Sequence, residues 1–176
     1  TGRFPEPKSI LEFTLSYIKE SQILKNQFKN ISILITAGPT IEEIDPIRFV
    51  SNKSSGKQGF EIASELTRRG AQVTLISGPV NIPFPICKKI IQVSTAKEML
   101  DNVIQQLPTD ILICSAAVAD WKLIPKTSSN NTIDTNNKIK KSNGKLLFEA
   151  EKNPDILETI AKSNTRPKIV IGFSAE

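Results

Sequence analysis

Histidine is absent from all 176 residues of the chain, and this absence narrows the chemistry that the chain can perform by itself. Without histidine there can be no Ser-His-Asp triad, no Cys-His pair and no His-ligated zinc site within the chain. Acid–base catalysis would then depend on Asp, Glu, Lys or an ordered water molecule.

Cysteine is also scarce, since Cys87 and Cys114 are the only two, lie far apart and form no C-x-x-C pair. Each is expected to be a packed thiol rather than a metal ligand or half of a disulfide. The sequence contains no apolar run long enough to span a membrane and no signal-peptide pattern. We therefore expect a cytoplasmic protein with no membrane partner.

Aromatic residues are few, with 1 Trp, 1 Tyr and 8 Phe, and they do not alternate with basic residues as base-stacking surfaces require. The net charge of +5 is modest; it could help attract an anionic substrate, and it gives little support for a nucleic-acid partner. A hydrophobic fraction of 39% and this length are ordinary for one soluble globular domain.

The sequence pattern alternates between buried strands and helices. We predict helices from Ser9, near 23–28, over 57–69, over 95–106, and from Asn153 or Pro154 to Lys162, with Asn153 as cap. We predict strands at 33–36, 72–77, 89–93, 110–115, 145–149 and 168–173. This alternation implies right-handed βαβ units, so we predict an α/β protein with a Rossmann-like three-layer fold and a mostly parallel sheet.

The loop after the first strand is dense in small residues, hydroxyls and charges; it contains Asp45, Arg48, Asn52, Ser54, Ser55 and Lys57. Such a loop between a strand and a helix suits phosphate or carboxylate binding, although a plain Gly/Ser-rich connector is the alternative. A Walker A loop would need Gly at 51 and Ser or Thr at 58, and the dinucleotide pattern G-x-G-x-x-G is incomplete. The loops after residues 36, 77 and 115 are expected to open onto one edge of the sheet, where ligands bind.

Residues 125–143 are polar and lack an apolar period, so we predict a mobile flap. Inside it lies KIKK at 138–141, three cations around one apolar residue. A lysine run is most often a solvated surface, and that interpretation stays open on composition alone.

Seven motifs in order resemble the phosphopantothenate–cysteine ligase family: TAGPT (36–40), DPIRFVSNKSSGKQG (45–59), RGAQVTLISGPV (69–80), SAAVADW (115–121), KIKK (138–141), KNPDI (152–156) and IGFSAE (171–176). More specifically, they resemble the ligase half of the bacterial bifunctional coenzyme A biosynthesis protein. The resemblance implies a CTP-binding ligase domain over 30–176, C-terminally truncated. Residues 2–6, GRFPE, resemble the end of that protein's decarboxylase half. They imply that 1–29 is a junction segment and linker helix.

The resemblance implies a reaction in which the carboxylate of 4'-phosphopantothenate attacks the α-phosphate of CTP, and the amine of cysteine then displaces CMP from the acyl-cytidylate. It further implies Mg²⁺ as a helper, a homo-oligomer formed through ligase dimers, and FMN in a decarboxylase half outside this chain. Other branches of the family use ATP, and the composition does not distinguish the two nucleotides.

The resemblance also implies roles for particular residues. Asn52 would hold the acyl group of the intermediate, Arg48 would handle the same substrate, and Lys138 would contact the nucleotide and act in the second half-reaction. The other nucleotide-binding residues implied are Ser115, Ala116, Ala117, Asp120, Asn153, Pro154, Asp155, Ile156 and Phe173. No metal ligand is assigned.

Four of these residues have a purely structural alternative. Asn52 could form an Asx turn. Arg48 could pair with Asp45. Asp120 and Asn153 could be helix caps. At the level of the whole chain, the alternatives are a non-catalytic dimerisation or scaffold module of the decarboxylase and a Rossmann NAD(P) enzyme, which the missing glycine fingerprint disfavours.

Overall fold

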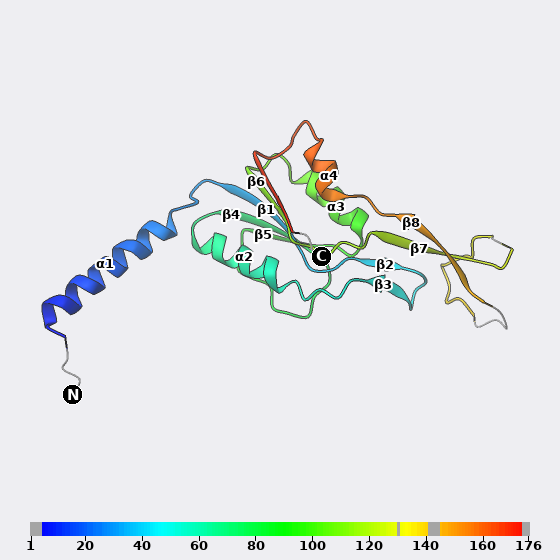
Figure 1. Ribbon diagram of the computed structural model, residues 1–176, viewed down its shortest axis with the longest axis horizontal. Helices are drawn as coiled ribbons and strands as arrows, with labels where there is room; N and C mark the ends of the chain where they lie inside the picture. Colours follow the sequence, from blue (N-terminus) through cyan, green and yellow to red (C-terminus); the bar gives the residue numbers. More distant parts are fainter. Residues whose placement is uncertain (1–4, 130, 141–144, 174–176) are drawn as a thin grey trace.

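Five parallel strands form the central sheet of the computed structural model, in the order β5-β4-β1-β6-β9 (Figure 1). The structure describes residues 5–129, 131–140 and 145–173, with the side chains of 20–23 excepted. The sheet strands are β1 (Ser32–Ala37), β4 (Gln72–Ser77), β5 (Lys89–Gln92), β6 (Ile111–Cys114) and β9 (Ile169–Gly172). The helices are α1 (Pro7–Lys25), α2 (Lys57–Arg68), α3 (Ala96–Gln105) and α4 (Ile156–Ala161).

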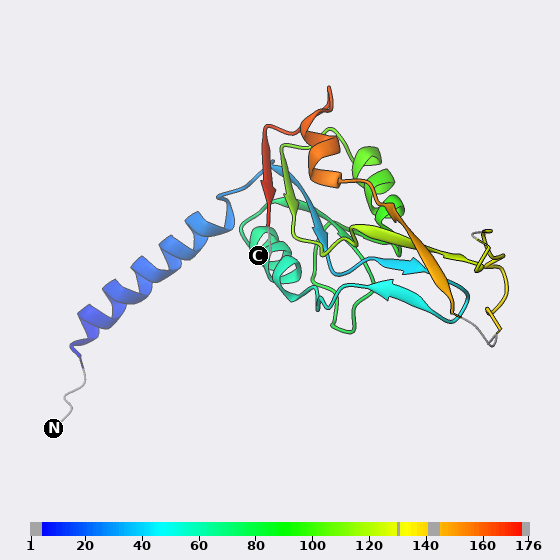
Figure 2. The same ribbon diagram turned by 45° about the vertical axis from the view of Figure 1, so that its right-hand side comes forward.

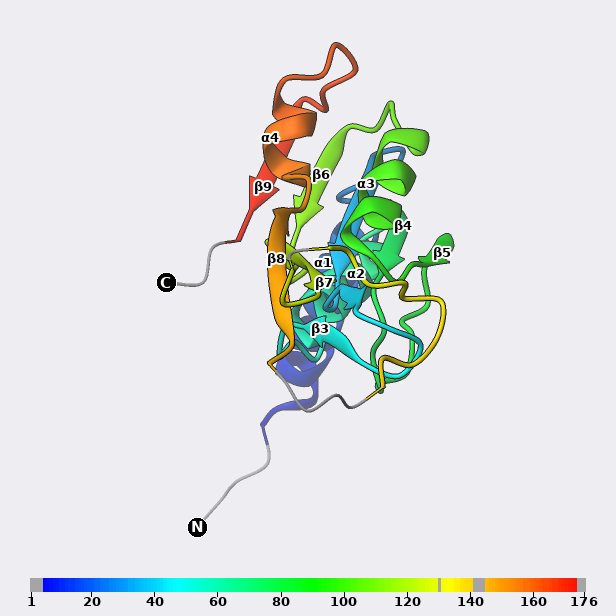
Figure 3. The ribbon, with the colours of Figure 1, turned by 90° about the vertical axis from the view of Figure 1, so that its right-hand side faces the viewer.

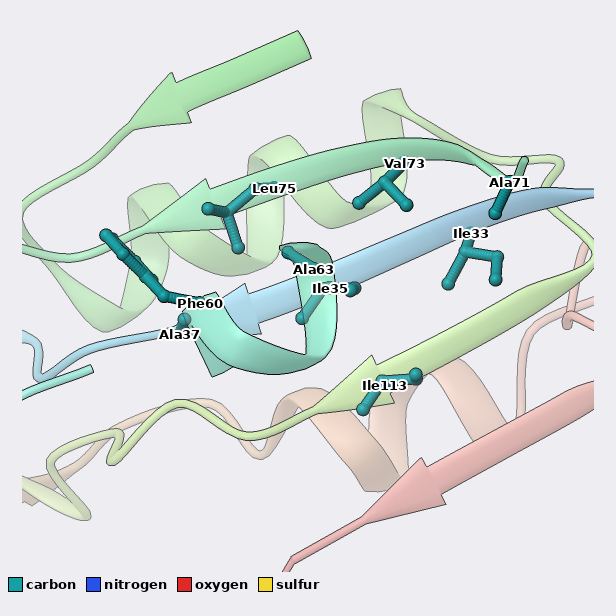
Figure 4. Close-up of a cluster of buried hydrophobic side chains, with 9 residues drawn as sticks. All are labelled: Ile33, Ile35, Ala37, Phe60, Ala63, Ala71, Val73, Leu75 and Ile113. Carbon is teal, nitrogen blue, oxygen red and sulfur yellow. The ribbon is translucent and has the colours of Figure 1, made fainter. Parts of the chain in front are cut away.

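Helices cover both faces of the sheet, which confirms the predicted three-layer α/β fold (Figures 1 and 3). Successive residues of β1 point to opposite faces because side chains alternate along a strand. Ile33 and Ile35 pack with Phe60 and Ala63 of α2 in one buried cluster (Figure 4). On the other face, Leu34 packs with apolar residues of α3 and α4: Met99, Val103, Ile156 and Ile160. The two buried clusters, one on each face of β1, therefore consist largely of residues from the strands and helices that the sequence predicted.

Two antiparallel ribbons extend from the sheet. One pairs β2 (Ile41–Glu43) with β3 (Phe49–Ser51), and the other pairs β7 (Trp121–Lys126) with β8 (Leu147–Lys152). The loop predicted after the first strand is wrong for residues 41–43 and 49–51, which are strands. The strand predicted at 145–149 is present as β8, but it pairs with β7 outside the central sheet. All six residues of β8 are exposed, so no burial pattern indicates its partner. Part of the predicted flap is also strand, since Lys126 pairs with Leu147.

Helix α1 leads away from the sheet and packs little against it (Figures 1 and 2). It is one continuous helix, and the further helical stretch predicted near 23–28 is wrong beyond Lys25 because residues 26–30 form turns. Its large apolar side chains are exposed: Ile10, Leu11, Phe13, Leu15, Tyr17 and Ile18. A surface of this kind is typical of a segment that another part of a protein covers.

Gly78 allows the end of β4 to touch the loop that follows β1. A Cβ at this position would lie 1.6 Å from the carbonyl oxygen of Pro39, which is backbone and cannot rotate away. We expect Gly78→Ala to lower the free energy of unfolding by about 3 kcal/mol, measured by urea denaturation. In the control Gly172→Ala, the new Cβ meets the flexible Leu157 side chain at 2.7 Å, so its cost should be clearly smaller. Equal costs for the two variants would contradict the prediction.

Candidate functional site

At the carboxyl edge of the sheet, the end of β1 and the loop after β6 line a crevice. β1 pairs with β4 on one side and with β6 on the other, and the carboxyl ends of such neighbouring strands are where ligands bind in open α/β sheets. The two loops are joined by hydrogen bonds: Ala117 N donates to Gly38 O over 2.9 Å, and Ala119 N donates to Thr40 Oγ1 over 2.9 Å. The floor of the crevice is therefore a fixed backbone.

Asn52 reaches this crevice from the segment between β3 and α2. Its side-chain amide donates from Nδ2 to Val118 O over 3.0 Å and to Ala117 O over 3.3 Å. Its amide thus bonds to backbone more than sixty residues away, so the Asx-turn alternative is not what the structure shows. The residue is exposed, so it presents a polar amide to solvent next to the loop after β6.

A cleft of about 390 Å³ lies beside Asn52's partners, between the loop after β6, α4 and the end of β9. Seven of the predicted nucleotide-binding residues line it: Ala116, Asp120, Asn153, Pro154, Asp155, Ile156 and Phe173. Ser115 and Ala117 stand beside the cleft rather than in its lining, and the hydroxyl of Ser115 donates to Thr36 O over 2.7 Å. The cleft has the size of a small-molecule site.

Both helix-cap alternatives at this cleft are wrong. Asp120 precedes strand β7, and its backbone oxygen accepts from Asn153 N over 2.8 Å. Asn153 donates from Nδ2 to Ala119 O over 2.8 Å, and the cap of α4 is Asp155, which accepts from Glu158 N over 2.8 Å. Asn153 therefore ties β8 to the loop after β6, and α4 begins three residues later than the earliest predicted start.

Cys114 and Thr36, which sequence reasoning did not assign to the site, also line this cleft. Burial raises the pKa of the Cys114 thiol to about 11 from an ordinary value of 9.0. A thiol is reactive only as its thiolate, so we expect native Cys114 to react with iodoacetamide at pH 8 about a hundredfold more slowly than an unperturbed thiol. Mass spectrometry after timed alkylation measures this rate. Reaction at the rate of the urea-unfolded chain would contradict the prediction.

Arg48 and Lys138 lie elsewhere, at the outer ends of the two ribbons. Arg48 forms the salt bridge with Asp45 that was the structural alternative for it, with Nε donating to Oδ2 over 3.0 Å. Both Arg48 and Lys138 line a second cavity of about 740 Å³. Among the described residues, its charged lining has five cations and one carboxylate: Arg48, Lys126, Lys138, Lys140, Lys145 and Asp134. Arg48 and Lys126 are paired with Asp45 and Glu149, which leaves three lysines against Asp134. This surplus of positive charge suits an anionic ligand.

The predicted site residues thus form two groups within one chain. The base group is Asn52 with the residues that line the 390 Å³ cleft, next to the sheet. The tip group is Arg48 with Lys138, in the segments that join β2 to β3 and β7 to β8. The two ribbons extend away from the sheet (Figure 1). The β7–β8 ribbon contains six residue pairs, so five steps of roughly 3.3 Å separate its two ends, a length of about 17 Å. The fold of a single chain does not bring Asn52 and Lys138 together.

Three further points concern metal ligands, membrane-spanning helices and one residue of the KIKK motif. In the part of the chain that the structure describes, no group of three or more His, Cys, Asp or Glu side chains could hold a metal ion. None of the described helices is long and apolar enough to cross a membrane. Lys141 of the KIKK motif lies outside the described residues.

Comparison with known proteins matches residues 28–176 to a family described as the DNA/pantothenate metabolism flavoprotein C-terminal domain. The coenzyme A biosynthesis bifunctional protein CoaBC of Haemophilus influenzae is 39% identical over 176 residues, which are 99% of this chain and 41% of that protein. CoaBC of Borreliella burgdorferi is 42% identical over 176 residues, again 99% of this chain and 42% of that protein. The chain therefore spans less than half the length of these relatives.

Solved structures give the same match. A crystal structure of the C-terminal domain of CoaBC is 38% identical, with a TM-score of 0.68, and covers 86% of this chain and 67% of that chain. A Cab2 mutant in complex with phosphopantothenate-cysteine has a TM-score of 0.60 over 96% of this chain and 70% of that chain. At 17% identity, this second similarity shows a shared fold alone.

Proposed function

Because the chain belongs to the family of the DNA/pantothenate metabolism flavoprotein C-terminal domain, we propose that it is the ligase part of a bifunctional coenzyme A biosynthesis protein. Its reaction is the CTP-dependent ligation of 4'-phosphopantothenate and cysteine, a C–N bond formation that gives 4'-phosphopantothenoylcysteine. The observation that carries this proposal is the bonding of Asn52 to the loop after β6, beside a cleft of nucleotide-binding size.

The chemistry proceeds in two steps. A carboxylate oxygen of phosphopantothenate attacks the α-phosphate of CTP, the bond to the β-phosphate breaks, and pyrophosphate leaves. The amine of cysteine then attacks the acyl carbon of the acyl-cytidylate, an amide forms, CMP leaves with the C–O bond electrons, and the amine loses a proton. Activation is needed because a carboxylate is a poor acylating agent, and the cations and oriented donors of the site offset the repulsion between two anions.

We assign two tasks to the base group, which is Asn52 with the residues of the 390 Å³ cleft: binding of the nucleotide and binding of the acyl part of the intermediate. Residues 115–117, Asp120, residues 153–156 and Phe173 would bind the nucleotide. The side chains of residues 115–117 are small, which lets the ligand approach the backbone there. The Asn52 amide would hold the acyl oxygen of the intermediate next to Ala117, with Nδ2 giving up one of its two bonds to Ala117 O and Val118 O when the intermediate binds. Lys138 would neutralise the phosphates, and the segment that carries it would cover the anhydride and exclude water.

A dimer would reconcile the two groups of site residues. The Asn52 and Lys138 groups lie at opposite ends of the ribbons, so a complete site requires Arg48 and Lys138 from a second copy of the chain to reach the first copy's crevice. A symmetric pair places each tip on the other chain's base, because the same surface patches meet twice in a two-fold interface. We therefore propose that the ligase works as a homodimer.

The cofactor proposals follow the reaction. CTP is the co-substrate, and Mg²⁺ enters with its triphosphate, since magnesium in such enzymes is held largely by substrate phosphates. FMN belongs to the decarboxylase half, which this chain does not include.

We propose a cytoplasmic location and assign residues 1–29, including α1, to the junction between the two halves. The family match starts at residue 28, after α1, whereas the CoaBC relatives align over 99% of the chain, which supports this assignment.

The test is release of pyrophosphate by the full-length protein in the presence of phosphopantothenate. We expect release that requires CTP, and formation of the amide that requires cysteine. Calorimetric titration with CTP should give saturable binding heat. A protein that releases no pyrophosphate and gives no saturable heat would be a scaffold module, and the proposed function would then be wrong.

A further inference from the structure

Asp45 connects two parts of the tip group that lie far apart in the sequence. Its side chain is entirely buried, whereas that of its partner Arg48 is 44% exposed. Burying a carboxylate is unfavourable unless hydrogen bonds and an opposite charge compensate, so its partners show what the burial stabilises.

The two carboxylate oxygens of Asp45 have different partners. Oδ1 accepts from Ile47 N over 2.9 Å and from Arg48 N over 2.8 Å, which closes the turn between β2 and β3. Oδ2 accepts from Arg48 Nε over 3.0 Å, from Arg48 Nη2, and from Ile139 N over 3.1 Å. One oxygen therefore stabilises a local turn, and the other holds a guanidinium group together with a backbone amide 94 positions away.

Ile139 is held from both sides. While its N–H donates to Asp45, its carbonyl oxygen accepts from Arg48 Nη2 over 3.2 Å. Ile139 lies between Lys138 and Lys140, and both lysines line the 740 Å³ cavity with Arg48. Fixing the backbone at 139 therefore restricts where two cationic side chains can reach.

We propose that Asp45 is a positioning residue that holds the Arg48 guanidinium and the Lys138–Lys140 backbone as one unit, so that the tip presents its cations to an anionic substrate in a fixed arrangement. The proposal rests on the proposed function for the identity of that substrate, which would be phosphopantothenate or the acyl-cytidylate. Asp45 itself does not touch the substrate.

Two observations favour this role over a purely local one. Asp45 could close its turn with Oδ1 alone, yet Oδ2 collects three further donors from Arg48 and Ile139. The Arg48 guanidinium is also the largest cause that holds the pKa of Asp45 well below its ordinary value of 3.8, and it outweighs the opposing effect of burial. The carboxylate therefore stays ionised at any physiological pH. Prior fixation of a flexible arginine and a loop lowers the entropic cost of binding.

The variant Asp45→Asn separates the two roles. Its remaining oxygen can still accept from the backbone N–H groups of residues 47 and 48, so the turn survives. Its new NH₂ group faces the N–H donors of Arg48 and Ile139, so the second set of bonds is lost. Glu43→Gln is the matched control, because it also removes one negative charge from the same ribbon at an exposed position.

Hydrogen exchange of the full-length protein, read by mass spectrometry, tests the contact directly. We expect peptides that contain Ile139 to exchange at least about tenfold faster in Asp45→Asn than in the unchanged protein and in Glu43→Gln. Peptides of β1 and β4 should exchange at the same rate in all three proteins, which shows that the fold is intact. Unchanged exchange at Ile139 would overturn the proposal.

Kinetics test the consequence for the reaction. We expect Asp45→Asn to lower kcat and to raise the KM for both phosphopantothenate and CTP, because Arg48 handles the first substrate in the proposed site and Lys138 the phosphates of the second. Glu43→Gln should leave all three values within twofold. Lost protection at Ile139 with unchanged kinetics would also overturn the proposal. If the unchanged protein shows no ligase activity, the proposed function is wrong, and the exchange experiment alone decides whether Asp45 holds the tip.

Discussion

Replacing Asn52 with aspartate should lower the rate of CTP-dependent pyrophosphate release by at least about a hundredfold in the full-length protein. The substitution keeps the size and shape of the side chain and removes the two N–H donors that Asn52 aims at Ala117 O and Val118 O. A carboxylate in this place would instead face two carbonyl oxygens, and it would repel the carboxylate that must approach the α-phosphate. Both effects act on the first step of the reaction.

The matched control is Asn164→Asp, the same chemical change in an exposed turn between α4 and β9. This variant should retain nearly full activity, because a surface substitution of this kind rarely changes stability by more than roughly 0.5 kcal/mol. Circular dichroism of both variants would show whether the fold is retained. Turnover by a folded Asn52→Asp protein at more than a tenth of the normal rate would remove Asn52 from the catalytic group.

The strands at the centre of the sheet could be predicted from the sequence because they are mostly apolar and buried. β1 and β4 are buried on both faces, so their β-branched runs stand out against polar loops. The helices α2 and α3 were also predictable, since each has one buried face, and Thr95 and Glu98 form a capping box at the start of α3. In these segments the secondary-structure preference of the residues and their pattern of burial indicate the same element.

The ribbons could not be predicted in the same way. β2 and β3 have three residues each, and β8 has no buried residue, so burial leaves no periodic pattern in their sequence. Their positions depend on distant contacts, such as Ile41 N donating to Ser94 O over 2.8 Å and Ile139 N donating to Asp45 over 3.1 Å. Bonds of this kind follow from the tertiary fold, and sequence periodicity does not report them.

The candidate site was also predictable in part and unpredictable in part. Resemblance identified residues around the cleft, and the sheet topology brings most of them together. The resemblance could not show that the ribbons separate Lys138 from Asn52, because that distance depends on the pairing of β7 with β8. The choice of cap for α4 was also beyond the sequence, since Asn153 and Asp155 are both common capping residues and only their bonds distinguish them.

The separation of Asn52 from Lys138 leads to a second prediction. Mixing two inactive variants should restore part of the activity. Asn52→Asp damages the base, and Lys138→Gln damages the tip. If each site combines the base of one chain with the tip of its partner, a mixed dimer contains one site with both residues intact. Random pairing of equal amounts makes half of the dimers mixed, so co-expressed variants should show about a quarter of the normal activity.

Combining both substitutions in one chain provides the decisive control. When this double variant is paired at random with an equal amount of unchanged chain, a mixed dimer has a damaged residue in each of its two sites. A shared site then predicts about a quarter of the activity of the unchanged dimer at the same total protein concentration, whereas a site within one chain predicts about half. Pyrophosphate release by co-purified, differently tagged chains measures both mixtures. No recovery in the first mixture, together with half activity in the second, would place each complete site within a single chain and disprove the shared dimer.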